Sequence, residues 1–491
     1  MTASTMPTPT ASATRTSTAG PTVTPSAKAT ATATPPPPAF DGGGAFVSVI
    51  AGGGPNGDKD LYFGGTVSPY FWVTSYDIAT CDVALTIDQA PGAGASWTVT
   101  ADYAALPVTQ NCNDVTSWST ASLGSISGAR QKTLTATAVA MPMTAPACFR
   151  GHMVANNAPN NRNGGVASFH CRNASGDAPI HLQGGGAAAA STAWYGGQVG
   201  RAANSDRTYW MMPGASLAAC SGVVAVPDAP GSGRTWHVTL ATSTTALTNE
   251  SDCSALTYAT TGDLCTITGT NKSCSWTPVV FATPMPDGGC IQVRASCTGG
   301  TCTQWSTSAN APNFGIDCST SAVSPYTAGA SAYESAGSGA FDSNHQFGAG
   351  PWAITDALWP FYPESQHYWV APPNGLNACA AAFSFTNAIV GSGSFSFAFS
   401  ISDTALGPNQ SCVDLTYSDT TASGMLAVGD RSVLVPQTNV TIPGNHCFAV
   451  QAIVDSGAPS AITTPANEFN WMAHCWENAG GGPTAIPTPT P

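Results

Sequence analysis

The cysteines are the residues of this sequence with the widest chemistry, because a thiol can form a disulfide, ligate a metal or act as a nucleophile. The chain of 491 residues contains 16 of them. Twelve recur as three sets of four, with intervals of 31, 36 and 23 residues, then 33, 37 and 28, then 33, 35 and 28. The sets are Cys81, Cys112, Cys148 and Cys171, then Cys220, Cys253, Cys290 and Cys318, then Cys379, Cys412, Cys447 and Cys475.

The wide intervals favour disulfides over metal ligation, because structural zinc sites draw their cysteines from closely spaced pairs. Four cysteines allow three pairings, of which we expect the first with the second and the third with the fourth. The remaining four form two close pairs, Cys265 with Cys274 and Cys297 with Cys302, which we expect to clip local loops. So many disulfides require an oxidising location, and we therefore expect the chain outside the cell, on a cell surface or on a virion surface.

Three other patterns could bind ions or cofactors. Asp58 and Asp60 stand in an oxygen-rich stretch that is typical of a calcium loop, although no distal glutamate follows. His170 and His474 each precede the last cysteine of a set, but neighbouring residues of a strand point to opposite faces, so we expect surface histidines there. The glycines of 52–57 match a dinucleotide-binding pattern, but no helix signal follows them. We expect no cofactor and no metal, with calcium at Asp58 and Asp60 as the alternative.

Catalytic motifs are not recognisable: the sequence has no nucleophile elbow, no zinc-binding HExxH helix and no phosphate-binding loop. Its 27 acidic residues include five glutamates and 22 aspartates, and the fold could still bring two carboxylates together for glycoside hydrolysis. Repetition argues against this, because repeated modules give binding proteins avidity and spacers length. We expect a protein that is not an enzyme.

Two features could involve carbohydrate. Aromatic residues outside the repeated positions could stack on sugar rings or could instead pack in the core, and the candidates are Trp194, Tyr195, Trp352, Trp359 and Tyr362. Several of them lie in 331–365, an insertion found only in the third repeat. N-glycosylation sequons, which a Ser/Thr-rich chain also contains by chance, occur at Asn173, Asn249, Asn271, Asn409 and Asn439.

The elements that position these residues also recur three times. An aromatic pair precedes the first cysteine of each set, at Phe71-Trp72, Tyr209-Trp210 and Tyr368-Trp369. A Gly-x-Gly turn and then an aromatic residue follow that cysteine, and the aromatic residues are Trp97, Trp236 and Phe395. Independent landmarks in the same order indicate three copies of one module.

Within a copy the pattern is that of strands and turns. Val83, Leu85 and Ile87 alternate with smaller residues, which predicts a half-buried strand. The Gly-x-Gly turn that follows predicts that this strand forms a hairpin with the strand around Trp97. Because glutamate is scarce and threonine and glycine abound, we predict an all-β chain of three tandem disulfide-stapled β-sandwiches, each a jelly roll or an Ig-like variant.

Composition sets the boundaries of these modules and excludes several function classes. We predict a Thr/Ser/Pro-rich linker at 1–38, modules at 39–178, 179–322 and 323–479, and a Pro/Thr tail at 480–491. With 8% charged residues and a net charge of −13, the chain is poorly suited to coiled coils or to nucleic acid. No apolar run is long enough to span a membrane. No secretion signal opens the sequence, so we expect either a segment of a longer exported protein or another route to an oxidising exterior.

The motif A-P-G-x-G-x-[S/T]-W-x-V-T, present at 90–100 and 229–239, and the later stretch L-C-T-I-T-G-T-N-K-S-C resemble the jelly-roll modules of phage, viral and bacterial surface proteins. The resemblance covers about half of each copy, and the third copy departs from it at 388–391. It implies a particle-surface or adhesive role.

We therefore expect a non-enzymatic structural or adhesive protein, such as a fibre, coat or filament component, whose partners are copies of itself or other surface proteins. An array of carbohydrate-binding modules with glycans as ligands is the alternative. A secreted glycoside hydrolase, as a catalytic or accessory protein, is the third hypothesis.

Overall fold

The structure is a computed structural model, and the residues that it describes are 44–49, 58–60, 72–75, 77–87, 90–157, 163–172, 200–202, 205–214, 216–226, 228–303, 313–319, 332–339, 352–353, 366–367, 369–371, 373, 375–385, 387–459 and 469–476. The predicted module boundaries and both predicted tails lie outside these ranges.

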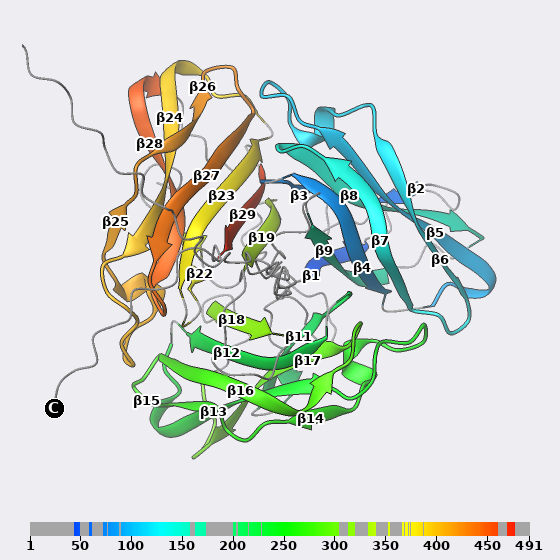
Figure 1. The fold of residues 1–491 in the computed structure, drawn as a ribbon, viewed down its shortest axis with the longest axis vertical. Coiled ribbons are helices and arrows are strands. Elements are labelled where there is room, and N and C mark those ends of the chain that lie inside the picture. Colours follow the sequence, from blue (N-terminus) through cyan, green and yellow to red (C-terminus); the bar gives the residue numbers. More distant parts are fainter. Residues whose placement is uncertain are drawn as a thin grey trace, which may run out of the picture. The chain divides into compact units, whose positions relative to one another are not determined.

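The described part of the chain is all-β, as predicted (Figure 1). Its helical elements are short 3₁₀ turns at Cys112–Asp114 (η1), Cys253–Ala255 (η2) and Cys412–Asp414 (η4). Within the residues described, no helix has the length and apolar character needed to cross a membrane. The prediction succeeds because β-branched and aromatic residues pack well on pleated sheets, whereas helix formers such as glutamate are scarce.

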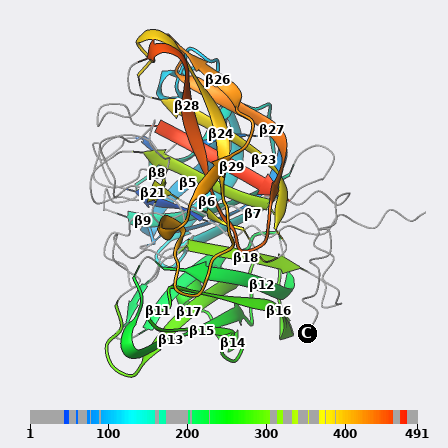
Figure 2. The same cartoon turned by 90° about the vertical axis from the view of Figure 1, so that its left-hand side faces the viewer.

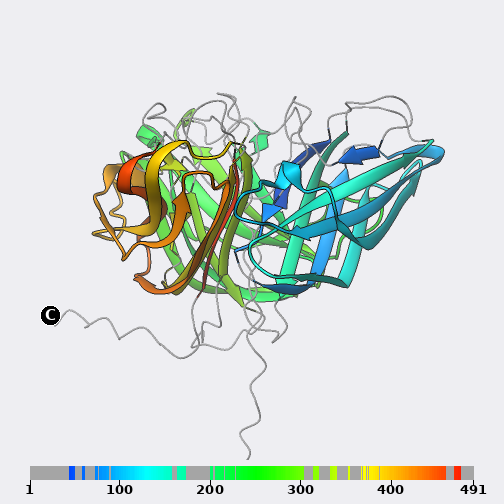
Figure 3. The same ribbon diagram turned by 90° about the horizontal axis from the view of Figure 1, so that it is seen from above.

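The described strands pair into seven sheets, and none of their pairings crosses between the stretches 44–172, 200–319 and 332–476, which we call the first, second and third groups. The first group covers 44–172. It forms two antiparallel sheets with the orders β1-β9-β4-β7 and β2-β8-β5-β6, and β3 also pairs with β8. These strands appear in blue and cyan in Figure 3. Their bounds are Gly44–Val49 (β1), Asp58–Asp60 (β2), Trp72–Val73 (β3), Ile78–Ile87 (β4), Gly92–Ala105 (β5), Ser119–Gly128 (β6), Thr133–Met143 (β7), Ala147–Asn156 (β8) and Asn163–Arg172 (β9).

The order of these strands is that of a jelly roll. The chain crosses between the two sheets at almost every connection, so that the first strand pairs with the last and the second with the last but one. Two interlocked Greek keys produce this order. An Ig-like sandwich would instead keep its successive hairpins within one sheet. Of the two predicted sandwich types, the connectivity of the first group matches the jelly roll.

The second group covers 200–319, with the sheet orders β16-β12-β18 and β10-β11-β17-β13-β14, and β15 also pairs with β13. Its strands from β11 to β18 repeat the order of their counterparts in the first group, and β10 adds a strand at the edge beside β11. The bounds are Gly200–Ala202 (β10), Ser205–Met211 (β11), Leu217–Ala225 (β12), Gly231–Ser243 (β13), Tyr258–Thr260 (β14), Cys265–Gly269 (β15), Ser273–Met285 (β16), Cys290–Thr298 (β17) and Asn313–Ser319 (β18).

The third group covers 332–476, with the sheet orders β19-β29-β23-β27 and β22-β28-β24-β25, and β26 also pairs with β24. Figure 2 shows its long strands β24 and β28 beside one another. The bounds are Ala332–Gly339 (β19), Trp369–Val370 (β22), Leu376–Phe385 (β23), Gly391–Ser402 (β24), Tyr417–Asp419 (β25), Ser423–Ala427 (β26), Ser432–Ile442 (β27), Cys447–Pro459 (β28) and Phe469–Trp476 (β29), with Trp352–Ala353 (β20) and Gln366–His367 (β21) as a separate pair.

The predicted hairpin across the Gly-x-Gly turn is wrong. β4 pairs with β7 and β9, whereas β5 pairs with β6 and β8, so the turn carries the chain from one sheet to the other. The glycines are needed for this change of direction, because the first glycine of the motif has φ of +105°, +101° and +102° at Gly92, Gly231 and Gly391. These backbone angles are unfavourable for any residue with a side chain.

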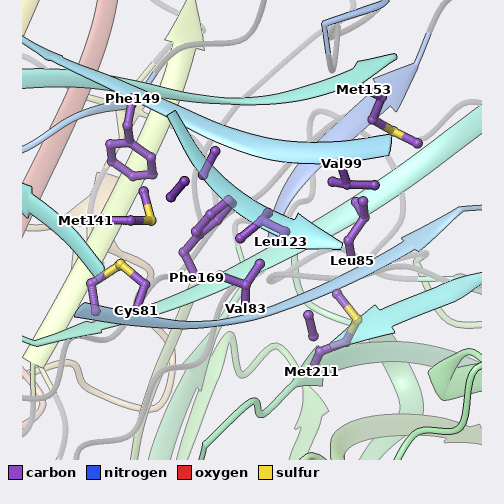
Figure 4. Packing of buried hydrophobic residues seen from close by; sticks show 14 of the residues in the cluster. Cys81, Val83, Leu85, Val99, Leu123, Met141, Phe149, Met153, Phe169 and Met211 are labelled. Atoms are coloured by element: carbon purple, nitrogen blue, oxygen red, sulfur yellow. A yellow bond between two sulfur atoms is a disulfide. The ribbon is translucent and has the colours of Figure 1, made fainter. Parts of the chain in front are cut away.

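The repeated aromatic residues lie between the two sheets of each group, as expected of core positions. Trp97 and Trp236 are each 1% exposed, and Phe395 is 2% exposed. Figure 4 shows the core cluster of the first group, in which side chains of β4, β5, β6, β7, β8 and β9 meet and which also includes Met211 of β11 from the second group. There the rings of Phe149 and Phe169 pack edge to face with centroids 5.6 Å apart.

The cysteines form disulfides, but the predicted pairing of first with second and third with fourth is wrong. The first joins the fourth, and the second joins the third, as the bonds Cys81–Cys171, Cys112–Cys148, Cys220–Cys318, Cys253–Cys290 and Cys412–Cys447 show. Cys379 is also in a disulfide, and the backbone register places Cys475 opposite it.

The physical reason for this pairing is the jelly-roll order. It makes the strand of the first cysteine a neighbour of the strand of the fourth, so Cys81 and Cys171 are cross-strand partners. The two predicted local clips, Cys265–Cys274 and Cys297–Cys302, are confirmed.

Candidate functional site: three like junctions

In each group the strand that contains the first cysteine is buried on both faces, whereas a half-buried strand was predicted. In β12 every residue is buried, and in β4 all residues from Cys81 to Ile87 are. One face carries large apolar side chains into the core of its own group. The other carries small residues, at Ala84 and Thr86 in β4, Val223 and Ala225 in β12, and Ala382 and Ser384 in β23. These outer faces are covered by the neighbouring group.

A pair of backbone hydrogen bonds marks each of the three places where groups meet. In each pair a basic residue and the hydroxyl residue after it donate their N–H groups to one carbonyl oxygen of the next group. At the first junction Lys132 and Thr133 donate to Asn249 (2.7 and 3.0 Å), at the second Lys272 and Ser273 donate to Pro408 (2.7 and 3.2 Å), and at the third Arg431 and Ser432 donate to Val108 (2.8 and 3.0 Å). The junctions thus run from group one to two, two to three and three to one.

The hydroxyl side chain of the same dipeptide adds a third hydrogen bond at each junction. It donates to a carbonyl oxygen beside the shared acceptor: Thr133 to Ser251 (2.5 Å), Ser273 to Gly407 (2.9 Å) and Ser432 to Pro107 (3.0 Å). The repeated hydroxyl therefore fixes the position of the neighbouring loop.

The apolar part of each junction is built on the disulfide between the second and third cysteines. At the third junction Ala382 of β23 packs with Val73, Leu106 and the Cys112–Cys148 disulfide of the first group. The other two junctions contain the equivalent disulfide with different apolar side chains around it. Tyr209, Met211 and the Cys253–Cys290 disulfide join the core cluster that contains β4, and Val370 and the Cys412–Cys447 disulfide pack on Val223 and Ala225.

An ion pair crosses each of the three junctions, and two of the three pairs are built alike. Lys272 contacts Asp414 at 2.8 Å, and Arg431 contacts Asp114 at the third junction. Both aspartates occupy the same place in a short 3₁₀ turn, where the carboxylate also accepts the N–H of the preceding cap residue. At the first junction Ala255 stands in this place, and the ion pair there joins the exposed side chains of Arg130 and Glu250 instead (3.8 Å).

We predict an acid-sensitive contribution from the pair at the second junction. Burial raises the pKa of Asp414, but hydrogen bonds from Lys272 and Ser411 outweigh it and hold this pKa below its ordinary value of 3.8. A carboxyl whose pKa is lowered by folding stabilises the fold above its ordinary pKa and loses that effect as the pH falls through the lowered value. Lys272→Met should therefore lower the melting temperature at neutral pH, and the difference from the wild type should shrink below pH 3.8.

The matched control for this experiment is Lys132→Met, which removes the equivalent lysine at the junction where Ala255 replaces the aspartate. Melting temperatures of both variants would be measured across the acid range. The difference from the wild type should shrink toward low pH for Lys272→Met and should not shrink for Lys132→Met. A difference for Lys272→Met that stays constant through this range would show that the ion pair contributes nothing.

A glycine allows close approach at the second junction, and substituting it gives a second prediction. A Cβ on Gly315 in β18 would lie 2.3 Å from the carbonyl oxygen of Val370 and 2.9 Å from a methyl of Val223. Gly315→Ala must separate the second and third groups, and overpacking of this kind destabilises by about 2 kcal/mol. Urea denaturation measures the loss. Gly262→Ala, where a Cβ meets no atom within 4 Å, should leave the midpoint nearly unchanged.

Outside the junctions, the first group has a buried ion pair across three strands. Asp102 of β5 is 6% exposed and accepts from Arg150 of β8 (3.2 Å) and from Thr120 of β6 (3.0 Å). The guanidinium of Arg150 also lies 4.7 Å from the ring of Trp118, which packs against the third junction. These contacts tie the outer sheet to that junction.

A second polar cluster joins His237 of β13, Thr298 of β17 and Asp263 between β14 and β15, in an arrangement that could support catalysis. His237 Nδ1 lies 2.6 Å from Asp263 Oδ2, and His237 Nε2 lies 2.9 Å from Thr298 Oγ1. A carboxylate that orients an imidazole against a hydroxyl is the arrangement of a general base and its nucleophile. The residues equivalent to His237 are Thr98 and Ser396, so the cluster is not repeated in the other groups.

Few of the other candidates predicted from sequence can be placed. Trp194, Tyr195, Trp359, Tyr362 and Asn173 lie outside the described residues, and for Asp58, Asp60, Trp352, His170, His474 and Asn439 only the strand backbone is described. Among the residues described, no group of three or more potential ligands could hold a metal ion. Asn249 is exposed and itself supplies the carbonyl acceptor of the first junction. Asn409 is exposed and follows Pro408, the acceptor of the second junction, and Asn271 precedes the donor Lys272.

The junction residues were not predicted, although one signal for them exists in the sequence. A basic residue followed by Thr or Ser occurs 51, 52 and 52 residues after the first cysteine of each set, at Lys132, Lys272 and Arg431. The small residues on the outer faces gave no signal, because alternation with small residues is also typical of a solvent-facing strand.

Comparison with known proteins adds little to this geometry. No protein-family model and no curated protein matches the chain. Among solved structures, the cryo-EM structure of arabinofuranosyltransferase AftD from mycobacteria aligns with 80% of this chain at 10% identity and a TM-score of 0.12. This chain spans 37% of the length of that protein, and a similarity this weak carries no argument about fold or function.

Proposed function

We propose that this chain is a non-enzymatic structural or adhesive component of an extracellular or particle surface. The observation that carries the proposal is the three like junctions, which the described part of the chain repeats in backbone, hydroxyl and disulfide contacts. The features that recur in all three groups are thus the contacts that join one group to the next. An active site that belonged to the repeated module would be repeated with it, whereas the residues equivalent to His237 in the other two groups are not histidines.

The disulfides support a location outside reducing compartments. The described residues contain no free cysteine, and disulfides in such number persist only where the surroundings are oxidising. They also replace part of the stability that surface ion pairs supply in more highly charged proteins, since only 8% of this chain is charged. Both properties suit a protein that must endure outside a cell.

Immunogold electron microscopy tests the proposed role. An antibody raised against the purified chain should label the outer surface of intact, unpermeabilised source material, and preabsorption with the purified chain should abolish the label. Label that appears only after permeabilisation would contradict the proposal. The pattern of label would also show whether the chain coats particles or forms filaments.

A hydrolase is the second candidate, and the Asp263–His237–Thr298 cluster is the specific observation in its favour. Neutral His237 would accept the proton of the Thr298 hydroxyl as its oxygen attacks an ester carbonyl, and would return it to the departing alcohol. Thr298 is exposed at the end of β17, where the Cys297–Cys302 disulfide clips the chain.

The test for this candidate is hydrolysis of p-nitrophenyl acetate by the whole chain, with mass spectrometry to find acetyl-Thr298. Activity that disappears in both Thr298→Val and His237→Ala, but not in a control at the exposed Thr244→Val, would establish an esterase. Equal background rates in all four proteins would eliminate it and leave the structural role.

A further inference from the structure

The three junctions are one interface used three times. One side always contributes the basic-hydroxyl dipeptide and the outer face of β4, β12 or β23. The other side always contributes the acceptor loop and the disulfide between the second and third cysteines. Because the two sides differ, the interface is heterologous, and such an interface repeats without end unless its rotation closes. Here it closes after three, since Arg431 and Ser432 return to Val108 of the first group.

We infer that these contacts, and not the connecting segments of chain, hold the three groups together, so that the chain is a trimer of sandwiches carried in one polypeptide. The partner that each junction surface fits is a sandwich of the same kind. This inference stands apart from the proposed surface role, because it concerns what joins the groups and not what the chain contacts.

The burial at the junctions supports a tight association. Ala382, Val370 and Val73 are each fully buried, and Val223 is 1% exposed. Interfaces with cores buried to this degree, hydrogen bonds and ion pairs are typical of permanent assemblies. The three junctions also support one another, because a group that leaves must break two of them at once.

The disulfides make this inference testable, because none of those described crosses from one group to another. Cutting the chain between the groups therefore leaves no described covalent bond between them. Protease recognition sequences with short Gly/Ser flanks would be inserted within 173–199 and 320–331, the stretches that connect the groups. Complete cleavage would be verified on a denaturing gel under oxidising conditions.

After cleavage at micromolar concentration, size-exclusion chromatography with light scattering should show one particle with the mass of the uncut chain. An otherwise identical chain with scrambled recognition sequences gives the reference mass. Separate fragments at this concentration would overturn the inference. Release of one fragment while the other two stay together would also overturn it, because the three junctions would then be unequal in strength.

A substitution at one junction shows that the surfaces described here are responsible. Val223→Glu places a carboxylate in the apolar centre of the second junction, and it should raise the dissociation constant of the cut fragments at least about tenfold. The matched control is Val280→Glu, because Val280 lies on β16 of the same sheet and is 52% exposed.

Two further checks separate a junction effect from misfolding. Val223→Glu must retain the mass and the disulfides of the wild type before it is cut. If it does not fold, Gly315→Ala provides a milder change at the same junction. Equal dissociation of the Val223→Glu or Gly315→Ala fragments and the Val280→Glu fragments would refute the role of the junctions.

Discussion

Replacing Cys81 and Cys171 by serine together should lower the free energy of unfolding by about 4–5 kcal/mol. The bond closes a loop of 90 residues and joins two strands in the middle of a sheet. Removing a cross-link over so long a loop releases much conformational entropy in the unfolded chain, and about 4.6 kcal/mol is expected from its length. Urea denaturation of the double variant, with the reduced and oxidised wild type alongside, measures the loss.

The Cys112–Cys148 disulfide provides the informative comparison. Its loop of 36 residues predicts a smaller loss of about 4 kcal/mol, yet it lies at the third junction, in contact with Ala382. Serine at both positions should therefore also expose the amides of Arg431 and Ser432, whose N–H groups bond to Val108 across that junction. Hydrogen exchange at these amides should rise in this variant more than in the Cys81/Cys171 variant. The opposite order would mean that the junction does not rely on its disulfide.

Much of the fold could be predicted because its signals are local and recur. Turn glycines, buried aromatics such as Trp97 and Trp236, and a set of four cysteines each appear three times, and each reports on nearby residues. The strand partners could not be predicted. An alternating pattern shows that 83–87 is a strand, but it is equally compatible with a hairpin and with a crossing to another sheet.

The disulfide pairing was predicted wrongly for the same reason, namely that the strand partners were unknown. The predicted hairpin makes β5 the neighbour of β4, whereas the jelly roll places β9 beside β4 and so Cys171 beside Cys81. The intervals between cysteines carry no information about which strands are neighbours. A non-local pairing of this kind is visible only when the order of the whole sheet is known.

The junctions were not predicted because they are built from small neutral side chains and backbone hydrogen bonds, which have no distinctive sequence pattern. Ala84, Thr86 and Ser384 are small and neutral, so a sequence gives no reason to distinguish a strand face covered by another sandwich from one covered by water. The dipeptides at Lys132, Lys272 and Arg431 become meaningful only when their acceptors across the junctions are known. The carbohydrate-binding alternative stays a prediction, because the structure does not describe the side chains of the aromatic residues on which it was based.

Trp236→Ala should cost about 3–5 kcal/mol, and the loss should spread through the junctions in a defined order. Trp236 is 1% exposed in a core cluster made only of residues from the second group. Loosening that group disturbs the acceptor at Asn249 and the donors Lys272 and Ser273, which belong to the first and second junctions. The third junction contains no residue of the second group, so it should be affected least.

Hydrogen exchange followed by mass spectrometry distinguishes this order from its alternatives. Peptides that cover Thr133 and Ser273 should exchange faster in Trp236→Ala, and the peptide that covers Ser432 should change least. Val280→Ala, at an exposed position of the same group, should leave all three near the wild type. Equal acceleration of all three peptides would show that the sandwiches open as one unit. Acceleration confined to the interior of the second group would show that they open independently, and either result would contradict a stepwise loss of junctions.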